Sequence, residues 1–148
     1  MKRLYPNQPI VGVGAVILSN SKILLEKRGN EPGKGKWSIP GGIVELGERL
    51  EDSVVREVKE ETGLEVEDPQ LLDVVSNMVL DGRGRVKYHF VIVDYLVKLK
   101  GGKGKAADDA EELEWVPLEE VEKYDLTKTF REFFQRNRQK LQSISHQV

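Results

Sequence analysis

Arg56, Glu57, Glu60 and Glu61 lie close together in the chain, and their spacing is suited to metal chemistry. At 100° per residue, a helix would place the three glutamates within about a third of its circumference. Like charges at these spacings repel each other, and acidic groups near a helix C-terminus oppose the helix dipole. Two interpretations follow: a solvated acidic helix face, or a site where a divalent cation offsets the repulsion.

The ligand types in this stretch determine which cation it would bind. The chain has no cysteine and only two histidines, His89 and His146, which are far from the glutamates in sequence. Carboxylate oxygens without imidazole or thiolate partners favour Mg²⁺ or Mn²⁺ over Zn²⁺. We therefore expect Mg²⁺ as the cofactor, with Mn²⁺ as a substitute.

The glutamates fall in a segment that predicts a single helix. No glycine or proline interrupts residues Leu50 to Thr62, and Gly63 stands where a left-handed C-terminal cap would be. Upstream, Gly41 and Gly42 follow a proline and allow the backbone to approach a ligand closely. The helix is thus preceded by a glycine-containing segment that could form part of the same site.

The remaining patterns predict strands and a second helix. Apolar runs and turn residues predict strands over residues 10–18, 23–28, 71–80, 86–99 and 113–116, with turns at 19–21 and 81–84. A short helical turn is expected from Pro117. The last segment has one apolar helical stripe, formed by Phe130, Phe133, Phe134 and Leu141. The sequence predicts an α/β fold in one domain spanning residues 1–148.

Composition excludes several functional classes. The 148 residues include 23 Lys and Arg against 25 Asp and Glu, for a net charge of -2. The lack of cysteine excludes a disulfide scaffold, a thiolate zinc site and a cysteine nucleophile. Near-neutral charge argues against a nucleic-acid polymer as partner, and no apolar run predicts a membrane span or a signal peptide. We expect a cytoplasmic protein without a membrane partner.

The spacing of particular residues from Gly42 to Leu64, a segment called the box below, resembles the signature of the Nudix hydrolases. It runs glycine, five residues, glutamate, seven residues, Arg-Glu, an aliphatic, any residue, Glu-Glu, any residue, glycine and an aliphatic, and it is met from Gly42 to Leu64 with Glu48 as the first glutamate. The lead-in over residues 37–42 also looks like that family. The resemblance implies a Nudix α/β/α sandwich, with a mixed central sheet, the loop-helix-loop of the box on one side and a C-terminal helix.

The resemblance also implies an enzyme that cleaves a nucleoside diphosphate linked to another moiety, using a divalent cation and water. Glu57 and Glu61 become the principal metal ligands, with Glu60 as a further ligand or part of the water network. A backbone carbonyl of Gly41 or Gly42 would complete the metal sphere. Pairing of Arg56 with Glu48 would orient these carboxylates.

The general base varies within this family, since some members take it from the box and others from a later acidic loop. Here the later loop spans residues 106–112, and Asp109 and Glu112 are its first candidates. An acidic, solvent-facing loop edge explains the same residues without a catalytic role.

Two residues outside the box are candidates for substrate binding. Arg28 ends a predicted strand near a glycine-rich loop and could bind a phosphate bidentately, or be an ordinary strand-end charge. Trp37 could stack on a base, or pack beneath the neighbouring loop.

The segment from Lys87 to Leu118 looks most like the small ADP-ribose pyrophosphatase-type members of the family. ADP-ribose or a related nucleotide sugar is therefore the expected substrate, although a proline found past the box in several such enzymes is missing near Leu80. Hydrolysis of oxidised nucleoside triphosphates is the alternative enzymatic interpretation. A non-catalytic nucleotide-sensing domain is the third, and the complete set of box carboxylates argues against it. The long strands offer edges for a homodimer.

Overall fold

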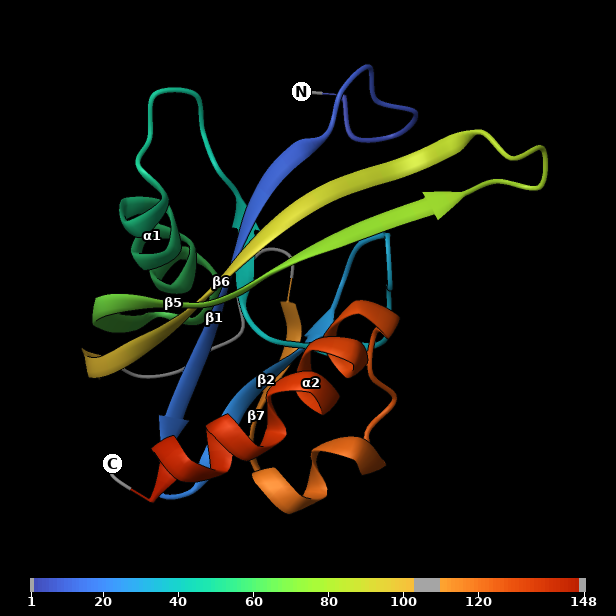
Figure 1. Cartoon of the computed structure of the whole chain (residues 1–148). Helices are drawn as coiled ribbons and strands as arrows, with labels where there is room; N and C mark the ends of the chain where they lie inside the picture. Colours follow the sequence, from blue (N-terminus) through green and yellow to red (C-terminus); the bar gives the residue numbers. More distant parts are fainter. Residues whose placement is uncertain (1, 103–109, 147–148) are drawn as a thin grey trace.

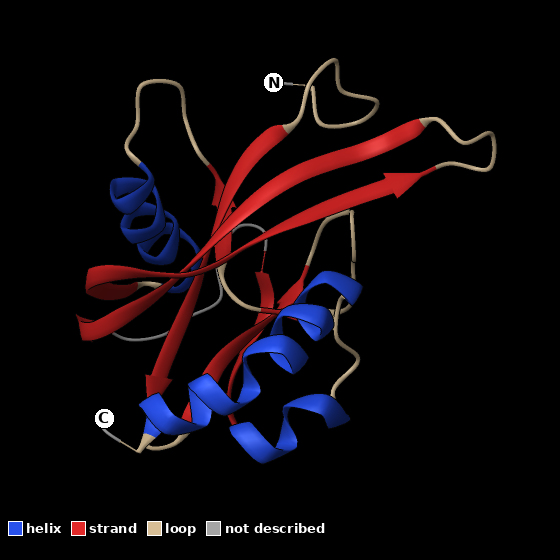
Figure 2. Ribbon diagram, in the orientation of Figure 1, coloured by secondary structure: helices blue, strands red, loops and turns tan. Residues whose placement is uncertain are grey.

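A mixed β-sheet with one helix on each face forms the body of the molecule (Figures 1 and 2). This computed structural model describes residues 2–102 and 110–146. The elements are β1 (Ile10–Ser19), β2 (Lys22–Arg28), β3 (Trp37–Ser38), β4 (Gly41–Ile43), α1 (Leu50–Thr62), β5 (Leu64–Leu80), β6 (Val86–Gly102), β7 (Ala110–Pro117), the 3₁₀ helix η1 (Leu118–Lys123) and α2 (Lys128–Ser145).

The sheet has the strand order β3-β2-β1-β6-β5, with β4 also paired to β1 and β7 to β2. Only β1 and β6 run parallel among the described pairs; the others are antiparallel. The central strand β1 is buried along most of its length, because its near-continuous apolar sequence is covered on both faces. The expected α/β/α sandwich with a mixed sheet is confirmed.

Each helix covers its own face of the sheet and its own core. On the α1 face, Val54 and Val58 pack against side chains of β1 and β6, including Val13, Ala15 and Tyr95. On the α2 face, the predicted apolar stripe of the last helix packs against β1, β2 and β7, and its buried residues are Phe130, Phe133, Phe134 and Leu141. The sheet therefore lies between two helices, each of which has its own core.

The predicted helix boundaries are confirmed in detail. Helix α1 spans Leu50–Thr62, and Gly63 takes the left-handed conformation with φ 77°, while its N–H bonds to the carbonyl of Lys59. The largest error in a strand boundary concerns β5, which begins at Leu64, seven residues before the expected start at residue 71. Asp68 has φ 53° and the pairing with β6 shifts beside it, so the strand continues through a segment that resembles a loop in sequence. An edge strand tolerates Pro69 there.

The β5–β6 hairpin extends far beyond the two helices (Figure 1). Its tip is the predicted turn at 81–84, where the Asp81 carboxylate accepts hydrogen bonds from the backbone N–H groups of Arg83 and Arg85. The hydroxyl of Tyr5 donates to the same carboxylate, so the N-terminal segment is held against the hairpin tip. The hairpin therefore supplies a long wall beside β1 and β4.

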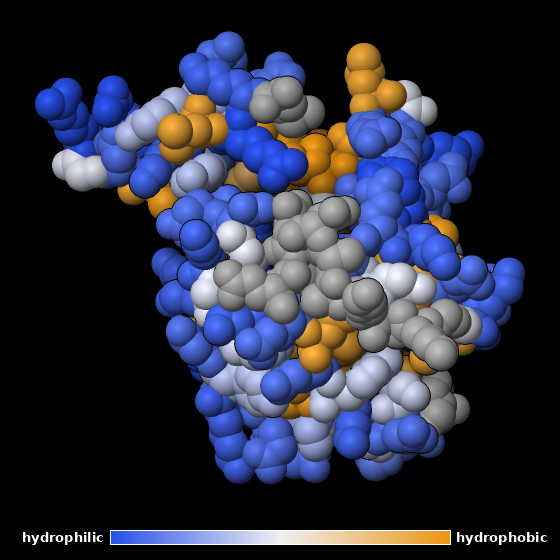
Figure 3. Space-filling view, turned by 180° about the vertical axis from the view of Figure 1, so that it is seen from behind, coloured by the Kyte–Doolittle hydropathy of each residue, from blue (hydrophilic) through white to orange (hydrophobic). Residues whose placement is uncertain are grey.

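Hydrophilic side chains cover most of the face shown in Figure 3, with apolar side chains between them. Within residues 2–102 and 110–146, neither helix has the length and apolar character needed to cross a membrane.

Candidate active site

The glutamates of α1 contact the two glycines of β4. The Gly41 N–H donates to Glu61 Oε2 at 3.2 Å. At Gly42, an added Cβ would overlap the Glu57 carboxylate, so only glycine allows that carboxylate to lie against the strand. The spacing of the glycines and glutamates therefore reflects a direct contact between β4 and α1.

Arg56 connects the loop, the strand and the helix around these carboxylates. Its Nε and Nη2 donate to the two oxygens of Glu48 at 2.6 and 2.8 Å, which confirms the expected pair. Its Nη1 donates to Glu57 at 2.8 Å and to Glu60 at 3.0 Å, and its Nη2 also donates to the carbonyl of Ile43 at 3.2 Å. The guanidinium thus offsets part of the carboxylate repulsion that the sequence predicts.

The same network explains the protonation of its members. The hydrogen bond from Arg56 lowers the pKa of Glu48 to about 2, against a smaller opposing effect of burial. Burial raises the pKa of Glu57, and the charges of Glu61 and Glu60 raise it further, whereas Arg56 opposes the shift. Additional positive charge beside Glu57 would favour its ionised form.

Three of the four expected metal ligands, Gly42, Glu57 and Glu61, line a common cavity. Glu57 and Glu61 both line it, and Glu61 is only 6% exposed. Glu60 does not line it; its side chain is 52% exposed and pairs with Arg56. Accordingly, the part of the chain that the structure describes contains no cluster of three acidic, histidine or cysteine side chains arranged to hold a metal. Glu57 and Glu61 are adjacent hard oxygen donors, and this donor set fits Mg²⁺ or Mn²⁺.

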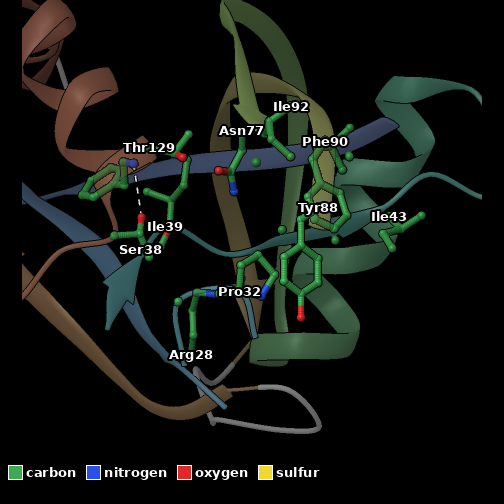
Figure 4. A pocket seen from close by; sticks show the side chains of 18 of the residues that line it. Arg28, Pro32, Ser38, Ile39, Ile43, Asn77, Tyr88, Phe90, Ile92 and Thr129 are labelled. Carbon is green, nitrogen blue, oxygen red and sulfur yellow. Dashed lines mark hydrogen bonds between the residues drawn. The ribbon is translucent and has the colours of Figure 1, made fainter. Parts of the chain in front are cut away.

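The cavity has a volume of about 820 Å³, within the usual range for small-molecule sites. It lies between β4, the inner face of the β5–β6 hairpin, the loop after β2 and the start of α2 (Figure 4). Its lining contains five cationic residues, Arg3, Arg28, Lys36, Lys87 and Lys128, and five acidic ones, Glu31, Glu45, Glu57, Glu61 and Asp94. The cationic side chains could bind phosphate groups of a ligand, while Glu57 and Glu61 would need a cation between them and such groups.

Of the other site residues suggested by the sequence, some line the cavity in the structure and others do not. Arg28 lines the cavity, and its Nε donates to the carbonyl of Pro32 at 2.8 Å, which anchors the side chain beside the loop. Trp37 is not among the described cavity residues; its ring packs edge-on against Tyr124, with centroids 5.3 Å apart. Glu112 is exposed on β7 opposite Lys27 and is likewise outside the cavity lining. Asp109 lies outside the described residues.

Sequence reasoning missed Asp94, which lines the cavity from β6 and is 3% exposed. A single charged residue within the apolar run from Phe90 to Val97 was the available signal. Asn77 on β5 and the stacked pair Tyr88 and Phe90 on β6 also line the cavity and were not assigned from sequence.

Replacing Arg56 with lysine tests the carboxylate network. Lysine keeps the charge but cannot donate to Glu48 bidentately while also reaching Glu57 and Glu60. We expect catalytic efficiency with Mg²⁺ to fall about 10- to 100-fold, and the Mg²⁺ concentration for half-maximal activity to rise. Kinetics over a Mg²⁺ titration would measure both values. The exposed Arg49, which ends the loop before α1, gives the matched control Arg49→Lys; equal effects of the two changes would contradict this role of Arg56.

The chain is similar in sequence to several known proteins and matches one family model. The model of the NUDIX domain matches residues 8–136. An ADP-ribose pyrophosphatase from Methanocaldococcus jannaschii is 42% identical over 133 residues, covering 88% of this chain and 76% of the relative. Putative nudix hydrolase 1 of Caenorhabditis elegans is 35% identical over 125 residues, but the chain spans only 32% of its length.

Two solved structures share the fold. A MutT NUDIX hydrolase from Burkholderia pseudomallei has a TM-score of 0.72 at 35% identity, covering 84% of this chain and 95% of the other. The NUDIX domain of Shewanella oneidensis NrtR, solved as a complex with ADP ribose, has a TM-score of 0.74 at 26% identity, covering 92% and 90%.

Proposed function

Because this chain belongs to the NUDIX family and is a Nudix hydrolase, we propose that it cleaves ADP-ribose or a related nucleotide sugar, giving AMP or the corresponding nucleotide and a phosphate ester. The observation that carries the proposal is that Glu57 and Glu61, the box glutamates beside β4, line one cavity that also contains cationic side chains such as Arg28, Lys36 and Lys128. The similarity to the archaeal ADP-ribose pyrophosphatase supports the choice of substrate.

We assign Mg²⁺ as the cofactor, with Mn²⁺ as a substitute, because the available side-chain donors are carboxylates. Glu57 and Glu61 would hold it, with the Gly42 carbonyl as a further donor and Glu60 joining from its place beside Arg56. When bound, the ion would offset phosphate charge and lower the pKa of an attacking water. Arg28, Lys36 and Lys128 would bind the phosphate oxygens that remain, and Arg56 would keep the glutamates in place.

In the proposed reaction, a water oxygen attacks one phosphorus and forms a new P–O bond. The bond from that phosphorus to the bridging oxygen breaks, and the leaving phosphate retains the bridging oxygen. The attacking water loses a proton to a base, for which the candidates are the box glutamates, Asp109 and Glu112. Separate Asp109→Lys and Glu112→Lys variants address the last two: a residue whose charge reversal leaves turnover unchanged is not the base.

The decisive experiment measures product release from ADP-ribose, nucleotide sugars, dinucleoside polyphosphates and nucleoside triphosphates, with Mg²⁺ and after chelation. We expect ADP-ribose or a nucleotide sugar to be the best substrate, and chelation to abolish turnover. Turnover confined to triphosphates would contradict the substrate proposal. Lack of metal-dependent turnover on every compound would favour a binding role for the domain.

A further inference from the structure

Asp94 is a buried acid on the cavity wall that the proposed hydrolysis does not use. It lies on β6, is 3% exposed, and lines the same cavity as Glu57 and Glu61. No hydrogen bond to its carboxyl group comes from residues 2–102 or 110–146. Burying a carboxyl group without a partner costs free energy, so a ligand that supplies the partner would recover it.

The neighbouring strand provides space for this carboxyl group. Gly14 of β1 pairs with Asp94 in the parallel register, and a Cβ at Gly14 would overlap Asp94 Oδ1. The same added atom would lie 3.0 Å from Ile39 Cδ1. Glycine weakens a strand interior, and it commonly marks a place where another group approaches the backbone closely. Here the group is the Asp94 carboxyl, beside the apolar side chain of Ile39.

The surroundings favour the neutral form of Asp94. Burial and, to a smaller extent, the charge of Asp73 on β5 raise its pKa to about 7, against the opposing charge of Arg136 on α2. A neutral carboxyl group presents one O–H donor beside one carbonyl acceptor. That pair matches a heterocycle edge that carries a ring nitrogen next to an amino group.

Apolar side chains enclose this end of the cavity. They come from β6, from α2 and from the segment before β4, and all line the cavity: Ile39, Ile92, Phe130 and Phe133. Tyr88 on the hairpin lies farther along the cavity, beside Pro32 and Ile43, and is only half-buried (Figure 4). A flat, largely apolar ring with one polar edge fits the Asp94 end better than the hairpin end.

We propose that Asp94 recognises the nucleobase of the substrate. Its carboxyl group donates a hydrogen bond to N1 of adenine and accepts one from the 6-amino group, while the four apolar side chains contact the ring. This inference rests on the proposed function, which supplies adenine as the base. Gly41, Gly14 and Asp94 lie in register on β4, β1 and β6, so the Cα atoms of Gly41 and Asp94 are about 10 Å apart across two strand spacings. One ribose unit can span such a gap between a base and its phosphates.

Binding of adenosine without metal tests the inference apart from catalysis. At pH 6, we expect Asp94→Leu to weaken adenosine binding about 5- to 100-fold by calorimetry, because two hydrogen bonds are lost. Asp94→Asn keeps a donor and an acceptor and should bind about as well as the wild type. The matched control is Asp52→Leu, which removes an exposed carboxylate of α1 that does not line the cavity and should leave adenosine binding unchanged.

The pH dependence separates this role from a structural one. The raised pKa of Asp94 means that its O–H donor is present below about pH 7 and is lost as the pH rises through 7. Asp73 has a lowered pKa and Arg136 is a guanidinium, so both keep their charge over this range. We therefore expect wild-type affinity for adenosine to fall between pH 6 and 8.5, and that of Asp94→Asn to stay constant.

Unchanged binding by Asp94→Leu would overturn the inference. An equal loss of binding by Asp52→Leu would also overturn it, as would absence of binding by the wild type. Melting temperatures of the variants identify any that fail to fold. If Asp94→Leu is one of them, the pH dependence of adenosine binding by Asp94→Asn still tests the inference. Failure of the proposed function has a different outcome: adenosine binds through Asp94, but ADP-ribose is not hydrolysed.

Discussion

Replacing Glu61 with glutamine is expected to lower Mg²⁺-dependent turnover about 1,000-fold. Glu61 is buried at the cavity wall, and one of its oxygens accepts the Gly41 N–H. Glutamine retains an oxygen for that hydrogen bond but removes the charge that would hold the cation. Loss of about 4 kcal/mol of transition-state stabilisation corresponds to this factor.

The measurement is initial-rate kinetics on the best substrate of the panel over a range of Mg²⁺ concentrations, together with calorimetric titration of Mg²⁺. Glu51 is an exposed carboxylate in the first turn of the same helix and provides the matched control Glu51→Gln. That variant should keep wild-type kinetics. If Glu61→Gln retained more than about a tenth of wild-type turnover, Glu61 could not be a principal metal ligand.

Replacing Phe134 with alanine is expected to reduce the free energy of unfolding by about 3–5 kcal/mol. The Phe134 ring is buried in the α2 core, and its centroid lies 6.0 Å from the centroid of the Phe130 ring. The Arg138 guanidinium lies over the Phe134 ring, 5.5 Å from the ring centroid. Alanine would leave a cavity between α2 and the sheet. Because α2 also supplies Phe130 and Phe133 to the substrate cavity, its attachment positions one wall of the site.

Chemical denaturation gives the free energy, and the midpoint of thermal unfolding should fall by about 6–20 °C. Gln139→Ala, on the exposed side of the same helix, should change the free energy by less than about 0.5 kcal/mol. A loss below about 1 kcal/mol for Phe134→Ala would mean that the helix is not held by this core.

Local patterns predicted the helices and most of the strands because their causes are local. An uninterrupted segment and a terminal glycine specify α1, and an apolar stripe specifies the buried face of α2. The start of β5 was mispredicted because residues 64–70 carry charges and Pro69, which suggest a loop. Pairing with β6 and the edge position of the strand override those preferences, and both depend on residues distant in sequence.

The contacts of the carboxylates could be predicted only in part. The pairing of Arg56 with Glu48 followed from the box, but the sequence left open whether Arg56 also contacts Glu57 and Glu60. Those contacts depend on side-chain rotamers set by β4 and by the loop before α1. Trp37 illustrates the same limit, since its packing against Tyr124 is decided by a residue 87 positions away in the chain.

The sequence by itself determined the family and the hydrolase class, and it predicted oxygen ligands for a metal, because all three depend on residue types at fixed short spacings. Only the tertiary structure decided which side chains share the cavity. It places Arg28 and Lys128 in the lining of the same cavity as Glu57 and Glu61, turns Glu60 out of the cavity toward Arg56, and buries Asp94 next to Gly14. The reason is physical: the sheet register aligns strands whose residues are far apart in sequence, and no local pattern encodes that alignment.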